Sequence, residues 1–143
     1  MIKLYTDRKP ITLQKFLILA EEGLIEGYES LAEFDPHVIE AILCEAYQPH
    51  VLVSKDDQGN WFVLYGMRIV RNVLQFMQNH EKLHDLNLIP ELNGHDYDSM
   101  PPVLWNKLND SILQIQSLTP SYDWNTKEEL RKLFISTIDS KEN

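Results

Sequence analysis

Apolar and polar residues recur along this chain with two different periods, and the change of period marks the predicted elements. The apolar run Trp61 to Leu64 follows the polar turn Asp56 to Asn60, and the run His50 to Ser54 precedes that turn. Two such runs on either side of a turn predict a β-hairpin. Gly66 ends the second run, and after it apolar residues recur at helical spacing: Val70, Val73, Leu74 and Met77. The pattern therefore predicts strand, turn, strand and helix, with the helix running from Met67 to Gln78.

The N-terminal part of the chain predicts a strand and a helix. Ile2 to Thr6 has the composition of a short strand, and Asp7 to Pro10 has that of a turn. A helix is expected from Leu13 to Glu22, with Thr12 as its N-cap and Gly23 at its end.

Asp35 followed by Pro36 is a strong start signal for a second helix, which is expected to end at Ala46. An Asp side chain accepts free amide protons at a helix start, and Pro suits the first helical turn. The buried stripe of this helix is predicted to consist of four apolar residues: Val38, Ile39, Ile42 and Leu43.

The C-terminal half gives three further elements. Ser99 is expected to cap a helix through Trp105 to Leu108, and Ser111 to Ser117 alternates in an ambiguous strand pattern. A last helix begins at Asn125 or Thr126. Together the elements predict a single α/β (α+β) domain over residues 1–143, with a small mixed sheet packed by about five helices.

Composition agrees with a soluble domain that has one core. The chain has 43% hydrophobic residues, and no segment approaches the ~20 apolar residues of a membrane span. The N-terminus lacks the apolar centre of a secretory signal, so we expect a cytoplasmic protein. Cys44 is the single cysteine, and we interpret it as a small apolar residue of the second helix.

The chain is strongly acidic, and its acidic residues are unevenly distributed. The net charge of −9 disfavours nucleic-acid binding, which depends on basic residues that neutralise phosphates. The segment from Glu21 to Glu45 contains eight acidic residues and no Lys or Arg. It is either a solvated face or a docking surface for a basic protein partner, with Glu26, Glu29 and Glu33 as the candidate contact residues.

The stretch Tyr65 to Ile69, between the predicted strand and helix, resembles the Asp-Gly-Gln-Gln-Arg region of a known family. That family is the N-terminal domain of GmrSD-type modification-dependent restriction endonucleases. Further matches are the helix Pro36 to Ala46, the leucine-rich run Leu86 to Gly94, and Met100 to Pro102. The resemblance covers roughly Ile11 to Phe134 and implies a ParB/sulfiredoxin-like fold.

This chain departs from the family at the motif itself. Only Gly66 remains; the other positions hold Tyr65, Met67, Arg68 and Ile69. An acidic side chain there could hold a metal or polarise a water, and an amide or guanidinium could orient phosphate oxygens. Tyr, Met and Ile cannot, so we expect no catalytic residue, no metal and no cofactor. His80 and His84 have the spacing of a metal-binding pair, but an exposed polar helix end is the preferred interpretation.

Three functions from different classes remain open. The preferred one is a catalytically degenerate domain that acts as a protein-binding or regulatory module in a phage or defence setting. It is favoured by the altered motif, by the acidic segment, and by the fading of the match near Phe134, which predicts no effector nuclease domain. The second is a nucleotide-binding or nucleic-acid-binding hydrolase subunit with a divergent pocket at Gly66, where Arg68 or Arg71 contacts phosphate at a helix N-terminus. The third is a structural subunit of a larger assembly.

Overall fold

A computed structural model describes residues 4–28, 33–46, 48–56 and 58–120. The elements follow in chain order: β1 (Leu4–Thr12), α1 (Leu13–Glu21), β2 (Ile25–Glu26), α2 (Pro36–Leu43), β3 (His50–Lys55), β4 (Trp61–Tyr65), α3 (Met67–Asn79), the 3-10 turn η1 (Pro90–Leu92), α4 (Pro102–Asp110) and β5 (Ile112–Pro120). The described residues thus form a mixed α/β domain, as the sequence predicted.

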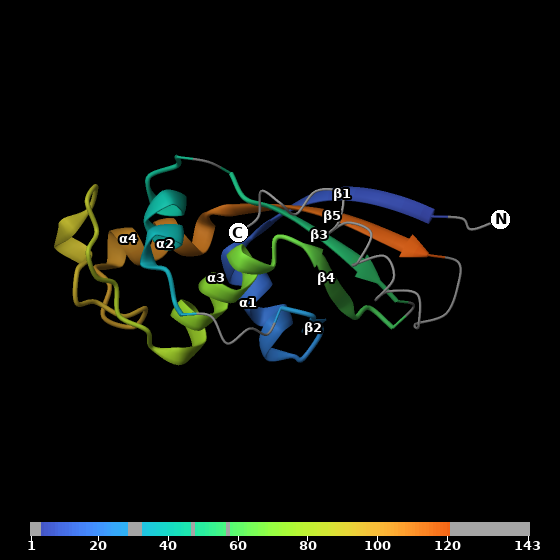
Figure 1. Cartoon of the computed structure of the whole chain (residues 1–143), viewed down its shortest axis with the longest axis horizontal. Coiled ribbons are helices and arrows are strands. Elements are labelled where there is room, and N and C mark those ends of the chain that lie inside the picture. The colour runs from blue at the N-terminus through green and yellow to red at the C-terminus, as the bar shows by residue number, and fades with distance from the viewer. Residues whose placement is uncertain (1–3, 29–32, 47, 57, 121–143) are drawn as a thin grey trace.

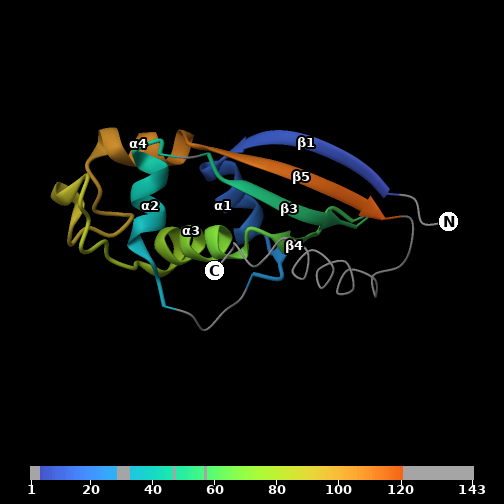
Figure 2. The same ribbon diagram turned by 45° about the horizontal axis from the view of Figure 1, so that its top comes forward.

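The strands form one mixed sheet in the order β1-β5-β3-β4-β2. β1 and β5 are antiparallel, β5 and β3 are parallel, β3 and β4 are antiparallel, and β4 and β2 are parallel. α2 and α4 gather at the end of the sheet where β3 and β5 begin, and α1 and α3 lie against the sheet on the same side (Figures 1 and 2). We call the side of the sheet turned away from α1 and α3 the far face.

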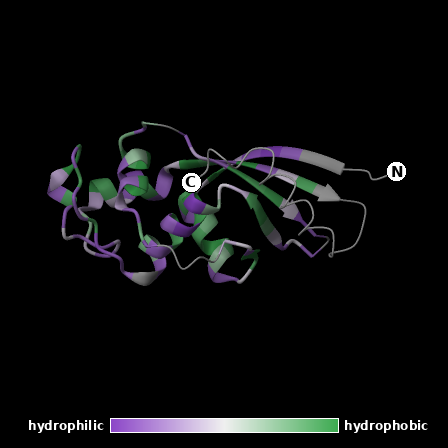
Figure 3. Cartoon of the chain, viewed as in Figure 1, coloured by the Kyte–Doolittle hydropathy of each residue, from purple (hydrophilic) through white to green (hydrophobic). Residues whose placement is uncertain are grey.

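The main core lies between the helices and the near side of the sheet. Leu13 and Phe16 of α1 pack there with residues of α3, β3 and β5, all of them buried: Val51, Val53, Val70, Val73, Leu74, Phe76, Leu113 and Ile115. The hydropathy of the strands agrees with a core beneath the middle of the sheet. The middle of the edge strand β1 is hydrophilic, whereas the inner strands β3 and β4 carry hydrophobic stretches (Figure 3). No helix within the described residues is long and apolar enough to cross a membrane.

The predicted hairpin and the predicted starts of α1, α2 and α3 are confirmed. β3 and β4 pair as an antiparallel hairpin, and α3 follows Gly66 directly. Thr12 caps α1, since its hydroxyl oxygen accepts a hydrogen bond from the Lys15 amide at 3.1 Å. Asp35 caps α2 in the same way, with its Oδ1 atom 2.9 Å from the His37 amide.

The predicted turn at Asp7 to Pro10 is wrong, because β1 runs without interruption from Leu4 to Thr12. Its pairing with β5 is continuous from Leu4 opposite Pro120 to Thr12 opposite Ile112. β1 is also an edge strand. Pro10 has no amide proton to donate to a neighbouring strand. An edge strand tolerates a proline where the missing N–H group would face away from its neighbour.

The predicted cap of α4 is wrong, and the ambiguous strand pattern that follows α4 is resolved. Ser99 does not cap α4, which begins at Pro102 after Pro101; instead the Ser99 amide donates to Asp96 Oδ1 at 2.9 Å within a turn. The ambiguous alternation after Ser111 is the strand β5. The described residues hold four α-helices, and the helix predicted from Asn125 or Thr126 lies outside them.

Candidate functional site

A row of side chains crosses the far face of the sheet from its β1 edge. Arg8 on β1 is opposite Gln116 on β5, Gln116 is opposite Leu52 on β3, and Leu52 is opposite Tyr65 on β4. Cross-strand partners share a face of the sheet. That face is the far one, because Leu52 packs in a small apolar cluster, separate from the main core, with three buried residues: Phe62, Leu64 and Leu118.

A β-bulge determines the direction of Tyr65. Leu52 pairs with Tyr65 and Val53 pairs with Val63, so Leu64 is an extra residue in β4. Strict alternation would place Tyr65 on the same face as Val63, which belongs to the main core. The extra residue turns Tyr65 back to the far face, which is a common use of a bulge beside a site.

Gly66 allows β4 and α3 to approach β3 closely. Its φ angle is +92°, and a Cβ atom there would lie 2.9 Å from the His50 carbonyl oxygen and 3.3 Å from the Val51 Cα atom. A side chain would therefore be strained by its backbone angle and would also collide with β3. This close approach brings the end of β4, with Tyr65, beside the start of β3, with His50.

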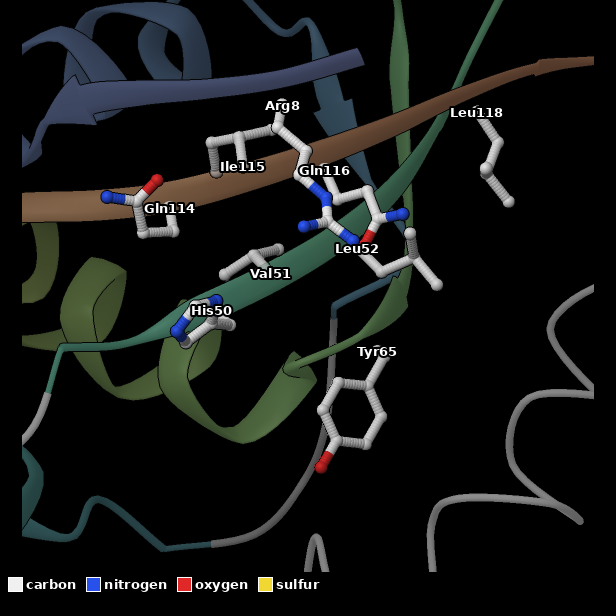
Figure 4. Close-up of a pocket in the computed structure, with 9 residues that line it drawn as sticks. All are labelled: Arg8, His50, Val51, Leu52, Tyr65, Gln114, Ile115, Gln116 and Leu118. Atoms are coloured by element: carbon white, nitrogen blue, oxygen red, sulfur yellow. The ribbon is translucent and has the colours of Figure 1, made fainter. Parts of the chain in front are cut away.

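A cavity of about 500 Å³ lies over this row, a volume within the usual range of small-molecule sites. It is lined by Arg8, His50, Val51, Leu52, Tyr65, Gln114, Ile115, Gln116 and Leu118. Figure 4 shows the Arg8 guanidinium beside the Gln116 amide and Leu52, and the Tyr65 ring beyond Leu52 with its hydroxyl directed away from Arg8. The cavity thus combines apolar side chains, among them Leu52 and Leu118, with polar groups of the same face.

The charge of the cavity is opposite to that of the whole chain. Arg8 lines it, and none of its described lining residues is acidic, although the net charge of the chain is −9. The side chain of Arg8 makes no ion pair or hydrogen bond with any residue that the structure describes, and the same holds for the side chains of His50, Tyr65, Gln114 and Gln116. These polar groups are therefore available to a ligand.

Arg68, a predicted site residue, already has partners within the fold. Its guanidinium contacts Asp35 Oδ2, while Asp35 Oδ1 caps α2. Asn72 is buried and completes the link: its Oδ1 accepts from the Asp35 amide at 2.6 Å, and its Nδ2 donates to the Arg68 carbonyl at 2.8 Å. This network joins the start of α2 to α3, and Arg68 does not line the cavity.

Arg71, the other predicted arginine, lies one turn further along α3 and also outside the cavity lining. Its Nε atom is buried without a hydrogen-bond partner, as is the Oε1 atom of Gln75. None of the predicted group Gly66, Arg68 and Arg71 lines the cavity, but Gly66 follows the lining residue Tyr65 and shapes the approach of β4 to β3. Arg8 was missed because a turn was predicted there, although the alternating Gln114 and Gln116 were visible in the sequence.

Only some of the acidic side chains between Glu21 and Glu45 are exposed. Glu33 is exposed, Glu26 is half-buried in β2, and Glu29 lies outside the described residues. Glu40 is buried, and its carboxylate accepts from the Leu88 amide at 2.7 Å, the Ile89 amide at 3.3 Å and His37 Nδ1 at 3.1 Å. Burial raises the pKa of Glu40, but the hydrogen bonds outweigh it and hold the pKa below its ordinary value. Glu40 thus anchors the connection after α3.

His80 lies beside two carboxylates, since Asp96 Oδ2 is also 3.9 Å from its Nδ1 atom, and His84 lies beside one. His80 Nδ1 lies 3.2 Å from Asp98 Oδ2, and His84 Nδ1 lies 3.0 Å from Asp85 Oδ2. Both imidazoles are exposed, with 63% and 60% of their side-chain surface accessible. Across the described ranges, no group of three or more His, Cys, Asp or Glu side chains is placed to hold a metal ion.

Comparisons with protein-family models, curated proteins and solved structures found no match for this chain. The chemistry of the cavity therefore rests on its own residues. A guanidinium binds oxyanions through paired N–H donors, and glutamine amides both donate and accept. Leu52, Leu118 and the Tyr65 ring offer apolar contact. The arrangement suits a small ligand that has an anionic end and an apolar body.

Proposed function

We propose that this domain is a non-catalytic binding module with a regulatory role, and that its recognition site is the far-face cavity. The observation that carries the proposal is Arg8, which lines the cavity without a partner among the described residues. Beside it lie glutamine amides and apolar side chains. Small-molecule sites have this composition, with mainly apolar walls and a few convergent polar groups.

The resemblance to the N-terminal domain of GmrSD-type endonucleases supports the same proposal. The cavity lies beside the position of the altered motif, because Tyr65 lines it and Gly66 adjoins it. We therefore propose a ParB/sulfiredoxin-like fold in which the former catalytic region has become a binding site. The order of strand, glycine and helix around Gly66 agrees with this interpretation.

A hydrolase is less well supported by the cavity residues. Hydrolysis requires a general base held in a defined orientation, or carboxylates that hold a metal. The described lining residues contain no carboxylate. His50 is the one imidazole among them, and no described residue bonds its ring to orient it. Binding, which needs no such orientation, fits these residues better.

The test is a fragment screen on the full chain, followed by ¹H–¹⁵N NMR. We expect chemical-shift changes at Arg8, Leu52, Gln114 and Gln116, and no chemical turnover of the bound fragments. Gln116→Phe should fill the cavity and remove the changes. Gln58→Phe is the matched control, because Gln58 is exposed in the hairpin turn. Hits that cluster elsewhere, or turnover that depends on His50, would contradict the proposal.

A further inference from the structure

We propose that the ligand of the far-face cavity is a small organic monocarboxylate. Its carboxylate would bind Arg8 and Gln116, and its apolar body would lie over Leu52 toward the Tyr65 ring. This inference rests on the proposed binding function and names the ligand class for the same site.

The charge of the lining side chains bears on the charge of the ligand. Arg8 is the single Lys or Arg among the described residues that line the cavity, so it balances one negative charge. A second negative charge on the ligand would have no basic side chain in the described lining to balance it. The chain, with its net charge of −9, would repel that second charge. A phosphate monoester carries close to two charges at neutral pH, whereas a carboxylate carries one. The cavity therefore favours a monoanion.

Arg8 and Gln116 have a geometry that suits a carboxylate. The N–H groups of a guanidinium form a planar fork that matches the two oxygens of a carboxylate. Gln116 is directly opposite Arg8 in the β1–β5 pair, and adjacent strands lie about 4.8 Å apart. The Gln116 amide can thus donate to the same carboxylate that Arg8 holds. Figure 4 shows the two side chains next to each other on the far face.

An apolar surface follows Arg8 and Gln116 across the sheet. Leu52 is the next residue in the row, and Leu118 lines the cavity beside it. Tyr65 comes next, about 10 Å from Gln116 at two strand spacings. Its hydroxyl points away from Arg8 (Figure 4). An apolar ring joined to the carboxylate therefore has room and contacts between Gln116 and Tyr65.

The test compares four probes of similar shape and different charge by NMR titration of the full chain. Phenylacetate is the predicted ligand type; phenylacetamide is neutral, phenethylamine is a cation, and phenyl phosphate has more negative charge. We expect phenylacetate to shift the Arg8, Gln116 and Leu52 signals and to bind about ten-fold more tightly than phenylacetamide, because its bond to arginine is charge-assisted.

Variants locate the carboxylate. Arg8→Gln should weaken phenylacetate binding by about ten-fold or more. Lys9→Gln is the matched control: Lys9 is the exposed neighbour of Arg8 on the same strand, and its cross-strand partner Ile115 belongs to the main core. Removing the Lys9 charge should change binding by less than about two-fold, because long-range charge effects are screened by salt.

The outcomes separate the two proposals. Equal binding of phenylacetamide, tighter binding of phenyl phosphate, or no effect of Arg8→Gln would overturn the carboxylate assignment while the cavity remained a binding site. Failure of all four probes to shift the cavity signals would also overturn it. The proposed binding function would fail only if the wider fragment screen also gave no hits in the cavity.

Discussion

The start of α3 and the far-face cavity lie close to Gly66, and each has an arginine that could contact a ligand. The two arginines differ in their partners. Arg68 contacts Asp35 and belongs to a network with Asn72 that joins α2 to α3. Arg8 has no such partner among the described residues. A charged residue next to a candidate motif can thus be part of the scaffold, while an arginine on a distant edge strand lines the cavity.

This difference has measurable consequences for stability and binding. Removing a group with internal partners leaves those partners unpaired, which costs free energy of unfolding. Removing an exposed group without partners changes stability by no more than about 0.5 kcal/mol. Variants in the two regions should therefore separate effects on stability from effects on binding.

The largest effect is expected at Gly66, which lies at the boundary between the two regions. Gly66→Ala should lower the free energy of unfolding by about 2–4 kcal/mol, because its Cβ atom would lie 2.9 Å from the His50 carbonyl oxygen. Urea denaturation measures the change. The same substitution should weaken binding of cavity ligands, since it moves β4 away from β3.

Gly59→Ala measures the cost of a positive φ angle without the collision that a Cβ atom would cause at Gly66. Gly59 has a similar φ of +86°, but a Cβ atom there would have no neighbour within 4 Å. We expect a loss of about 1 kcal/mol, from backbone strain alone. Equal losses at Gly59 and Gly66 would show that the close approach to β3 contributes nothing.

Glu40 comes next, as the buried acid that has internal partners. Glu40→Ala should cost about 1–3 kcal/mol, since it leaves the Leu88 and Ile89 amides without their acceptor. Glu40→Gln keeps an acceptor oxygen and should cost less. Both values come from urea denaturation near neutral pH. A Glu40→Ala variant as stable as the wild type would show that the carboxylate does not anchor the connection after α3.

The effect of Glu40 should also depend on pH. Its folded pKa lies below the ordinary value of 4.5, so its stabilising contribution is complete above that value and is lost as the pH falls through the lower folded pKa. The difference in unfolding free energy between wild type and Glu40→Gln should therefore shrink on acidification. A difference that stays constant through that range would contradict the direction of the pKa shift.

The link at the start of α2 should have a smaller effect. Asp35→Ala removes both the helix cap and the partner of Arg68, and we expect a loss of about 1–2 kcal/mol. Asp35→Asn keeps a capping oxygen and should lose less than about 1 kcal/mol, because the side chains of Asp35 and Arg68 remain 29% and 42% exposed. Thermal unfolding of both variants distinguishes the cap from the ion pair.

Sequence patterns predicted the local elements well where the signals were strong and short-range. The caps at Thr12 and Asp35, the hairpin and the α3 stripe all depend on residues within a few positions of one another. The order of the strands could not be predicted in this way. It places β5 between β1 and β3, which brings together residues about 100 positions apart, such as Arg8 and Gln116.

The candidate site depended on that long-range register. Gly66 could be predicted as a special position, because a glycine between a strand and a helix indicates a constrained backbone. The direction of Tyr65 could not, since it follows from a bulge at Leu64. The role of Arg68 was also hidden, because Asp35, its partner, lies 33 residues away along the chain. Local charge patterns do not show which arginine has an internal partner.

Arg8→Gln should have the smallest effect on stability. This variant is informative when it is compared with Arg68→Gln. Arg8 is exposed on an edge strand, so its substitution should change the free energy of unfolding by less than about 0.5 kcal/mol. Arg68→Gln should cost up to about 1 kcal/mol, because it breaks the partly exposed pair with Asp35.

For phenylacetate binding the order should reverse: Arg8→Gln should weaken it about ten-fold, and Arg68→Gln should leave it nearly unchanged. Paired urea and NMR titrations on the two variants measure both quantities. If Arg68→Gln weakened binding and Arg8→Gln did not, the ligand site would lie at the start of α3, and the far-face cavity would be a feature of the fold alone.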